Sequence, residues 1–347
     1  MATTLTETTF SSTYKDDFAD SAGYHRILFN SGKALQAREL TQLQTILSKQ
    51  IQRFGDNVFK EGAVVKPGGA NINPKYEYIK INPGTHAPAA DTSVYVGKEL
   101  TGTTSGVKAT VLQVVDASSP DPLTLYVRYT STKDDTSSAS TSTLRMQKNE
   151  LMSGEGTLQV ENSDDAVGVG TLATLAEGVY YVRGNFVFAD AQSKIVSKYS
   201  DNVTTDIGYK VTEDIVTTSD DTNLYDNQGT TPNTSAPGAD RYRIKLTIIE
   251  KKEITGNESF IHVASIKDSQ IFKAIQTANS FNVPNDMIAT RIRENSGDYI
   301  VKPFIAHFEP DSASSHLLLK VSDGVVVIDG YRAARSYPTH IRIPKVT

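Results

Sequence analysis

Hydrophobic residues recur every three or four positions between residues 34 and 54, in the segment ALQARELTQLQTILSKQIQRF. This spacing is the period of one face of an α-helix, so it predicts an amphipathic helix near the N-terminus. We expect its apolar face to pack in the protein core, and we expect Gly55 to end the helix in a left-handed conformation. The apolar face is made of Leu40, Leu43, Leu47, Ile51 and Phe54.

The other face of this helix is rich in glutamine, with Gln36, Gln42 and Gln50 as the candidate contact residues. Amides form hydrogen bonds without the desolvation cost of full charges, so such a face can contact another subunit or another protein. A polar face that is simply solvated explains the same pattern. The sequence leaves both interpretations open.

Residues 1–22 are rich in Thr, Ser and Asp, and they carry Phe10, Tyr14 and Phe18 at intervals of four. A disordered tail is one interpretation of this composition. The other is an N-terminal arm that docks on a partner through its three aromatic side chains.

After the helix the pattern becomes typical of β-structure. One kind of segment occurs three times: an acidic residue and a glycine, a short β-branched or aromatic run, and a second glycine. These segments are EGAVVKPG at 61–68, EGVYYVRG at 177–184 and DGVVVIDG at 323–330. Each predicts a short strand bounded by tight turns, because glycine tolerates positive φ. Acid–glycine turns before strands are also common in unrelated β proteins.

Residues 94–129 alternate between apolar and polar positions and predict three or four closely spaced strands, which suit a small inserted barrel or sandwich. The Ser/Thr-rich stretch 130–143 that follows is expected to be an exposed loop. Further strands are expected up to residue 343, and two further helices at 268–276, where Ile271, Phe272 and Ile275 share a face, and at 287–293.

The predicted fold class is therefore mainly β with a few α-helices (α+β), in several domains of short strands forming sandwiches or small barrels. We divide the chain into five segments. These are an N-terminal docking arm (1–22), a helix with a first β segment (23–92), a small inserted β domain (93–150), a central β domain (151–260), and a helix with a C-terminal β domain (261–347).

The composition narrows the function classes. There is no cysteine among the 347 residues, which excludes disulfides, thiolate zinc sites, iron–sulfur clusters and a cysteine nucleophile. The formal net charge of -5 argues against nucleic-acid binding. No window approaches the roughly 20 apolar residues of a membrane span, so we expect no membrane insertion.

No sequence motif for catalysis stands out. The chain lacks HExxH, GxxxxGK[ST] and GxSxG, and its paired carboxylates lie in polar loops. We therefore expect no catalytic residue, no cofactor and no metal. The window 220–227 holds oxygen donors suited to calcium, but it lacks the EF-hand spacing, and Asx turns explain it as well. We expect Leu224 and Tyr225 to anchor this long loop, and both are candidate interface residues.

Four stretches together resemble a family of virion structural proteins from contractile-tailed phages, especially cyanophages. They occur in the family's order: ALQARELTQLQTILSKQIQRFGDNVFKEGAVV at 34–65, EGVYYVRGNFVF at 177–188, TNLYDNQGTTPNTSAPGADRYRIKLTI at 222–248 and IRENSGDYIVKPF at 292–304. The last continues through the strand at 323–330 to Tyr331.

The resemblance implies a non-enzymatic protein of the phage tail baseplate, made in the host cytoplasm and located in the virion. Its expected partners are other tail and baseplate proteins, tail fibres, and copies of itself, with a trimer favoured. Family members are often longer than this chain, which favours an assembly or fibre-attachment component over a complete fibre. The alternatives are a tail-fibre protein that binds a host polysaccharide receptor and an enzyme that degrades envelope glycan.

Overall fold

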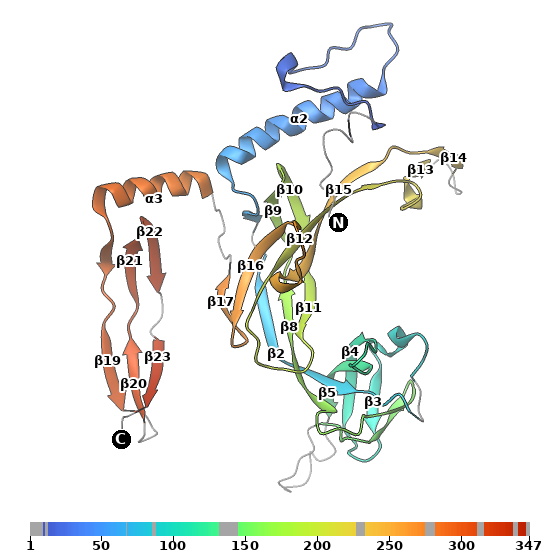
Figure 1. The fold of residues 1–347 in the computed structure, drawn as a ribbon, viewed down its shortest axis with the longest axis vertical. Helices are drawn as coiled ribbons and strands as arrows, with labels where there is room; N and C mark the ends of the chain where they lie inside the picture. The colour runs from blue at the N-terminus through green and yellow to red at the C-terminus, as the bar shows by residue number, and fades with distance from the viewer. Residues whose placement is uncertain are drawn as a thin grey trace. The chain divides into compact units, whose positions relative to one another are not determined.

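The computed structural model describes residues 10, 13–66, 68–84, 88–131, 145–226, 233–274, 282–310, 316–335 and 339–344. In these residues strands dominate, and they are accompanied by the α-helices α2 (Ala37–Val58) and α3 (Asn282–Ser296), as Figure 1 shows. The strands form several sheets. The expectation of a mainly β chain with several domains and few helices is confirmed.

The chain forms two compact units, each built from segments that are distant in sequence. Unit 1 comprises Met1–Lys15, Val64–Tyr180 and Phe186–Ala278. Unit 2 comprises Asp16–Ala63, Tyr181–Asn185 and Asn279–Thr347.

The largest sheet of unit 1 has eight antiparallel strands in the order β11-β8-β2-β5-β4-β3-β6-β7. An isolated bridge between Ile81 and Val160 brings the end of this sheet back beside β2, but in the described residues no ladder closes it into the expected barrel. The strands are β2 (Ala70–Lys80), β3 (Glu99–Gly102), β4 (Lys108–Val115), β5 (Thr124–Ser131), β6 (Leu151–Gly154), β7 (Gly156–Gln159), β8 (Val167–Leu175) and β11 (Gln192–Ser197).

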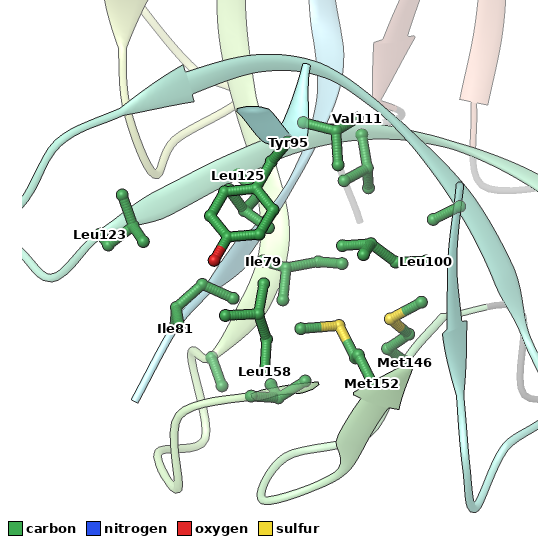
Figure 2. Close-up of a cluster of buried hydrophobic side chains, with 14 of the residues drawn as sticks. Ile79, Ile81, Tyr95, Leu100, Val111, Leu123, Leu125, Met146, Met152 and Leu158 are labelled. Carbon is green, nitrogen blue, oxygen red and sulfur yellow. The ribbon is translucent and has the colours of Figure 1, made fainter. Parts of the chain in front are cut away.

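The strands at one end of this sheet surround a hydrophobic core, drawn in Figure 2. Alternate residues of each strand point inward, so Ile79, Leu100, Leu125 and Leu158 are all fully buried there. Tyr95 reaches the same core from a 3₁₀-helix (Thr92–Tyr95). The strand expected at residues 94–96 is therefore wrong.

A second sheet of unit 1 has the order β15-β12-β16-β17, with β12 (Thr205–Val216), β15 (Arg241–Glu250), β16 (Phe260–Lys267) and β17 (Gln270–Ala274). The strand β17 and the turn before it occupy residues 268–274 of the helix expected at 268–276, so that expectation is wrong. Asp268 and Ser269 take left-handed φ values of 49° and 56° and form a tight turn. Pairing of Ile271 with Ile266 of β16 then overrides the weak helical period.

The three glycine-bounded segments each contain a strand, as predicted: β1 (Val64–Lys66), β9 (Gly178–Val182) and β21 (Gly324–Ile328). Gly62, Gly184 and Gly330 all have positive φ, between 76° and 80°, which supplies the expected tight turns. β1 and β9 pair with each other in one sheet with β10 (Asn185–Ala189).

The C-terminal part of unit 2 is a three-stranded antiparallel meander in two sections (Figure 1). Ser322 and Ile305 are joined by two hydrogen bonds of 2.9 Å at the junction between the sections. One section is β18 (Tyr299–Lys302), β21 and β22 (Tyr331–Arg335); the other is β19 (Ala306–Pro310), β20 (His316–Val321) and β23 (Thr339–Pro344). The helix expected at 287–293 is confirmed by α3.

In the described part of the chain, neither α2 nor α3 is both long and apolar enough to span a membrane.

Candidate functional site

The helix α2 continues through Gly55, so the expected helix end at this residue is wrong. Gly55 is buried within the helix, and a Cβ atom placed there would lie 2.4 Å from a ring carbon of Tyr181. The Tyr181 hydroxyl lies 2.7 Å from the Asp56 carboxylate and 3.0 Å from the Gln52 carbonyl. Burial, with the Asp56 carboxylate beside it, raises the Tyr181 pKa above its usual range. A glycine is required here because it allows the ring to lie against the helix backbone.

The polar face of α2 is covered by the chain's own N-terminal segment. Asp16, a buried carboxylate, accepts hydrogen bonds from Thr45 Oγ1 and from the backbone N–H of Phe18. Asp17 accepts from Gln42 Nε2 at 3.3 Å. Further along, Asp20 forms an ion pair with Arg53 at 2.5 Å. The arm is thus held on α2 by aspartates, and Gln42 contacts the arm of its own chain.

The other two candidate glutamines have different surroundings. The backbone N–H of Gln36 donates to the Glu39 carboxylate at 2.9 Å, which caps the start of α2. Gln50 is exposed, and it lines a small pocket together with Phe18 and Ile46. The structure therefore brings Gln50 and Phe18 together but leaves Gln36 at the helix N-terminus.

The three aromatic residues of the arm do not form one cluster. Phe10 and Tyr14 belong to unit 1, and Phe18 belongs to unit 2. The ring of Phe10 packs edge-on against Tyr242, with 5.4 Å between ring centroids. The Tyr14 hydroxyl donates to Asp240 at 2.7 Å, and this carboxylate raises the Tyr14 pKa. Both side chains have partners within their own unit.

Leu224 and Tyr225 lie where backbone contacts join the two sides of the long loop. The Leu224 carbonyl accepts from Gly238 N–H at 3.0 Å, and Tyr225 pairs with Pro237 between β13 (Tyr225–Asp226) and β14 (Asn233–Pro237). The Asp221 side chain accepts from the Asn223 N–H at 3.0 Å, which is an Asx turn. Residues 227–232 lie outside the described residues. In those that are described, no three His, Asp or Glu residues gather as metal ligands.

The apolar face of α2 is exposed, so the expectation that it packs in the core is wrong. Leu40, Leu47, Ile51 and Phe54 are between 45% and 67% exposed, and Ile46 is the large side chain of α2 that is buried. The arm and Tyr181 occupy the other sides of the helix. We call this row, made of the exposed Leu40, Leu47, Ile51 and Phe54 together with the half-buried Leu43, the α2 stripe.

A second uncovered apolar surface, which the sequence analysis missed, lies on the sheet β19-β20-β23. The register places Phe308, Leu319 and Ile341 in one row across the three strands, and Ala306 beside Val321 on the same face. Phe308 is 60% exposed and Ile341 is 47% exposed. We call this surface the β19-β20-β23 face.

The opposite face of that sheet is polar. The Glu309 carboxylate lies 3.0 Å from His307 and 3.3 Å from Lys320, and these partners lower its pKa. Alternation in HIRI at 340–343 carries this signal in the sequence, whereas the three consecutive leucines at 317–319 obscure it on the middle strand. Glu309, His307 and Lys320 thus form ion pairs on one face of the sheet, and the apolar row lies exposed on the other.

One polar pocket of unit 2 lies between α3 and the β21–β22 turn. Arg293 of α3 forms an ion pair with Asp329 at 3.1 Å, and Asp286 of α3 accepts hydrogen bonds from Lys60 and Tyr331. These partners lower the pKa of Asp286. Since Asp286, Arg293 and Asp329 all have partners in unit 2, we interpret this pocket as a structural joint that holds α3.

The sequence matches the model of a protein family described as a domain of unknown function, DUF4815, over residues 12–114 and 133–347. No curated protein matches the chain. No solved structure matches it either.

Proposed function

Because the chain belongs to the DUF4815 family of domains of unknown function, we propose its role from its own residues: a non-enzymatic structural protein of a phage tail baseplate, acting in assembly or tail-fibre attachment. The four sequence segments that resemble virion structural proteins, at 34–65, 177–188, 222–248 and 292–304, motivate the phage assignment.

The observation that supports an assembly role is the uncovered apolar surface of unit 2. A helix and a sheet of this unit both leave an apolar face exposed: the α2 stripe and the β19-β20-β23 face. Large contiguous apolar patches are rare on monomeric proteins and mark sites of protein–protein contact. Such surfaces suit a protein that is completed by its neighbours in an assembly.

The proposed partners are other tail and baseplate proteins, tail fibres, and further copies of the chain, with a trimer favoured. In this proposal the protein resides in the virion, binds no nucleic acid and inserts into no membrane. Binding energy in such contacts comes mainly from a few well-packed apolar anchors, which exposed side chains such as Phe54 and Phe308 can provide.

Purified particles of a phage that encodes the chain provide the test. Tails are separated from heads and from free protein, and the chain is quantified in each fraction by mass spectrometry. A fixed number of copies per tail is expected. Absence from washed tails would contradict the proposal. Selective binding of the purified chain to one saccharide on a glycan array would instead favour the receptor-binding alternative.

A further inference from the structure

The α2 stripe is narrow. At about 100° of rotation per residue, its five members fall within an arc of about 80°. Helices that pack on a globular core usually present an apolar stripe at least about 100° wide, whereas a seam between two helices is narrower. The width of the α2 stripe therefore suits another helix better than a sheet.

The spacing within the stripe indicates the same kind of partner. Leu40, Leu47 and Phe54 are seven residues apart, and Leu43 lies between the first two at the complementary heptad position. This a/d pattern is the one by which helices interlock in coiled coils. The next complementary position is Gln50, which places one polar residue at the edge of an otherwise apolar seam.

The remaining sides of α2 are already occupied by the same chain. Thr45 and Gln42, which hold aspartates of the arm, lie about opposite the stripe on the helical wheel. Gly55 lies under the ring of Tyr181. In the described part of unit 2, the stripe is thus the apolar side of α2 that remains exposed.

In this heptad the seam is flanked by Gln44 and Ile51 on one side and by Glu39, Ile46 and Arg53 on the other. The nearby charges are engaged within the chain: Glu39 accepts from the backbone of Gln36, and Arg53 pairs with Asp20. Partner choice between different coiled-coil helices usually depends on charges at these borders. Glu39 and Arg53 carry opposite charges towards the two ends of one flank, so an antiparallel copy of α2 would bring each beside the other, and the charge pattern is complementary to a copy of itself.

We propose that the α2 stripe is a self-association seam, in which α2 packs against α2 of a second copy of this chain. The inference deepens the proposed assembly role and rests on it, because it names one partner within that assembly. Leu47 lies at the centre of the seam, so it faces its own copy in a parallel pair and lies within one helical turn of it in an antiparallel pair centred on the stripe.

The absence of cysteine from the chain allows a direct test. Leu47→Cys introduces one thiol at the centre of the seam, and Ser48→Cys introduces one at the next residue, which is also exposed but lies about 100° around the helix. The full-length variants are oxidised under identical mild conditions and resolved on non-reducing gels. Since a disulfide needs Cα atoms within about 7 Å, we expect Leu47→Cys to form covalent dimer at least about tenfold faster than Ser48→Cys.

Equal rates for the two variants would overturn the proposal, since random collisions would then explain the disulfide. A second variant, Leu47→Glu, keeps the test independent of cysteine chemistry. An unchanged circular dichroism spectrum would show that this variant still folds. Light scattering should then give the mass of the monomer, and an unchanged oligomer mass would contradict the seam. If the chain is present in tails but Leu47→Cys forms no disulfide-linked dimer, this inference is overturned and the proposed function stands. If the chain is absent from tails, the proposed function is overturned.

Discussion

Units 1 and 2 differ in how many of their hydrophobic side chains are buried. Of the 39 hydrophobic side chains that are buried in the described residues, 33 lie in unit 1 and six in unit 2. Of the 26 large hydrophobic side chains that are exposed there, seven lie in unit 1 and 19 in unit 2. Unit 1 encloses its own core, and unit 2 presents its apolar residues outward.

Because of this difference, we expect unit 1 to be stable by itself and unit 2 to depend on assembly. The eight-stranded sheet of unit 1 surrounds a core that needs no second chain. Three-stranded sheets such as those of unit 2 gain stability when their hydrophobic face is covered, because pairing between strands alone contributes little. Unit 2 should therefore respond to protein concentration and partners, and unit 1 should not.

The largest effect is expected when the same substitution, leucine to alanine, is made in each unit. Leu125→Ala in unit 1 removes a fully buried side chain and should lower the free energy of unfolding by about 3 kcal/mol. Leu47→Ala in unit 2 removes an exposed one and should cost less than about 0.5 kcal/mol in the dissociated chain. Denaturant unfolding at several protein concentrations measures both.

The Leu125→Ala loss should be independent of concentration, because its partners lie in the same unit. The Leu47→Ala loss should grow with concentration as copies associate. Equal losses for the two variants at low concentration would show that the stripe is covered within one chain.

The next largest effect is expected on the side of α2 that packs against Tyr181. Gly55→Ala places a methyl group within the ring of Tyr181, so it should destabilise unit 2 by about 1–3 kcal/mol, although alanine favours a helix. In a Tyr181→Leu background the ring is gone, and the same change should be neutral or stabilising by up to about 1 kcal/mol. Hydrogen exchange of α2 provides the readout, and a cost that persists without the ring would contradict this packing.

Much of the secondary structure was predictable from local pattern. The helical period predicted α2 within a few residues at each end, and the glycine-bounded segments predicted β1, β9 and β21. In contrast, the period of α2 reveals that one face is apolar but not what covers it. That depends on Asp16 and Tyr181, which are distant in sequence from the residues they touch.

The wrong or missing predictions also depend on contacts between residues that are distant in sequence. The turn at Asp268 and Ser269 contains no glycine, so the sequence of the β16–β17 hairpin lacks the local signal that distinguishes it from a helix. The β19-β20-β23 face requires a register between three strands, which a single strand does not specify. Local signals therefore located the elements, and long-range pairing determined which surfaces remained open.

A smaller effect tests whether Asp16 holds residues 16–20 of the arm on α2. Asp16→Ala removes the buried carboxylate that accepts from Thr45 and Phe18, and it should release the arm at a cost of about 1–2 kcal/mol. Asp17→Ala is the matched control, since Asp17 is exposed and should cost less than about 0.5 kcal/mol. Limited proteolysis between residues 16 and 30 reports release. Equal protection in both variants would show that other contacts hold the arm.

The smallest effect compares two glutamates that pair with lysine, one in each unit. In unit 1, Lys210 lies 2.6 Å from Glu258, whose side chain is 13% exposed. In unit 2, Lys320 lies 3.3 Å from Glu309, whose side chain is 38% exposed. Hydrogen bonds to these carboxylates lower the pKa of both. Each carboxylate therefore stabilises the fold above its unfolded pKa of about 4.3, and this contribution is lost as the pH falls through the lower folded pKa.

Glu258→Gln and Glu309→Gln remove these two contributions, so each variant should lose part of the acid sensitivity of the parent chain. The difference in melting temperature between parent and variant should therefore shrink as the pH falls below about 4, and it should start out larger for Glu258→Gln because solvent screens its ion pair less. Melting curves across this acid range measure both differences. A larger effect at Glu309 would mean that the β19-β20-β23 sheet is shielded from solvent in the assembled protein, and the contrast between a closed unit 1 and an open unit 2 would then hold only for the free chain.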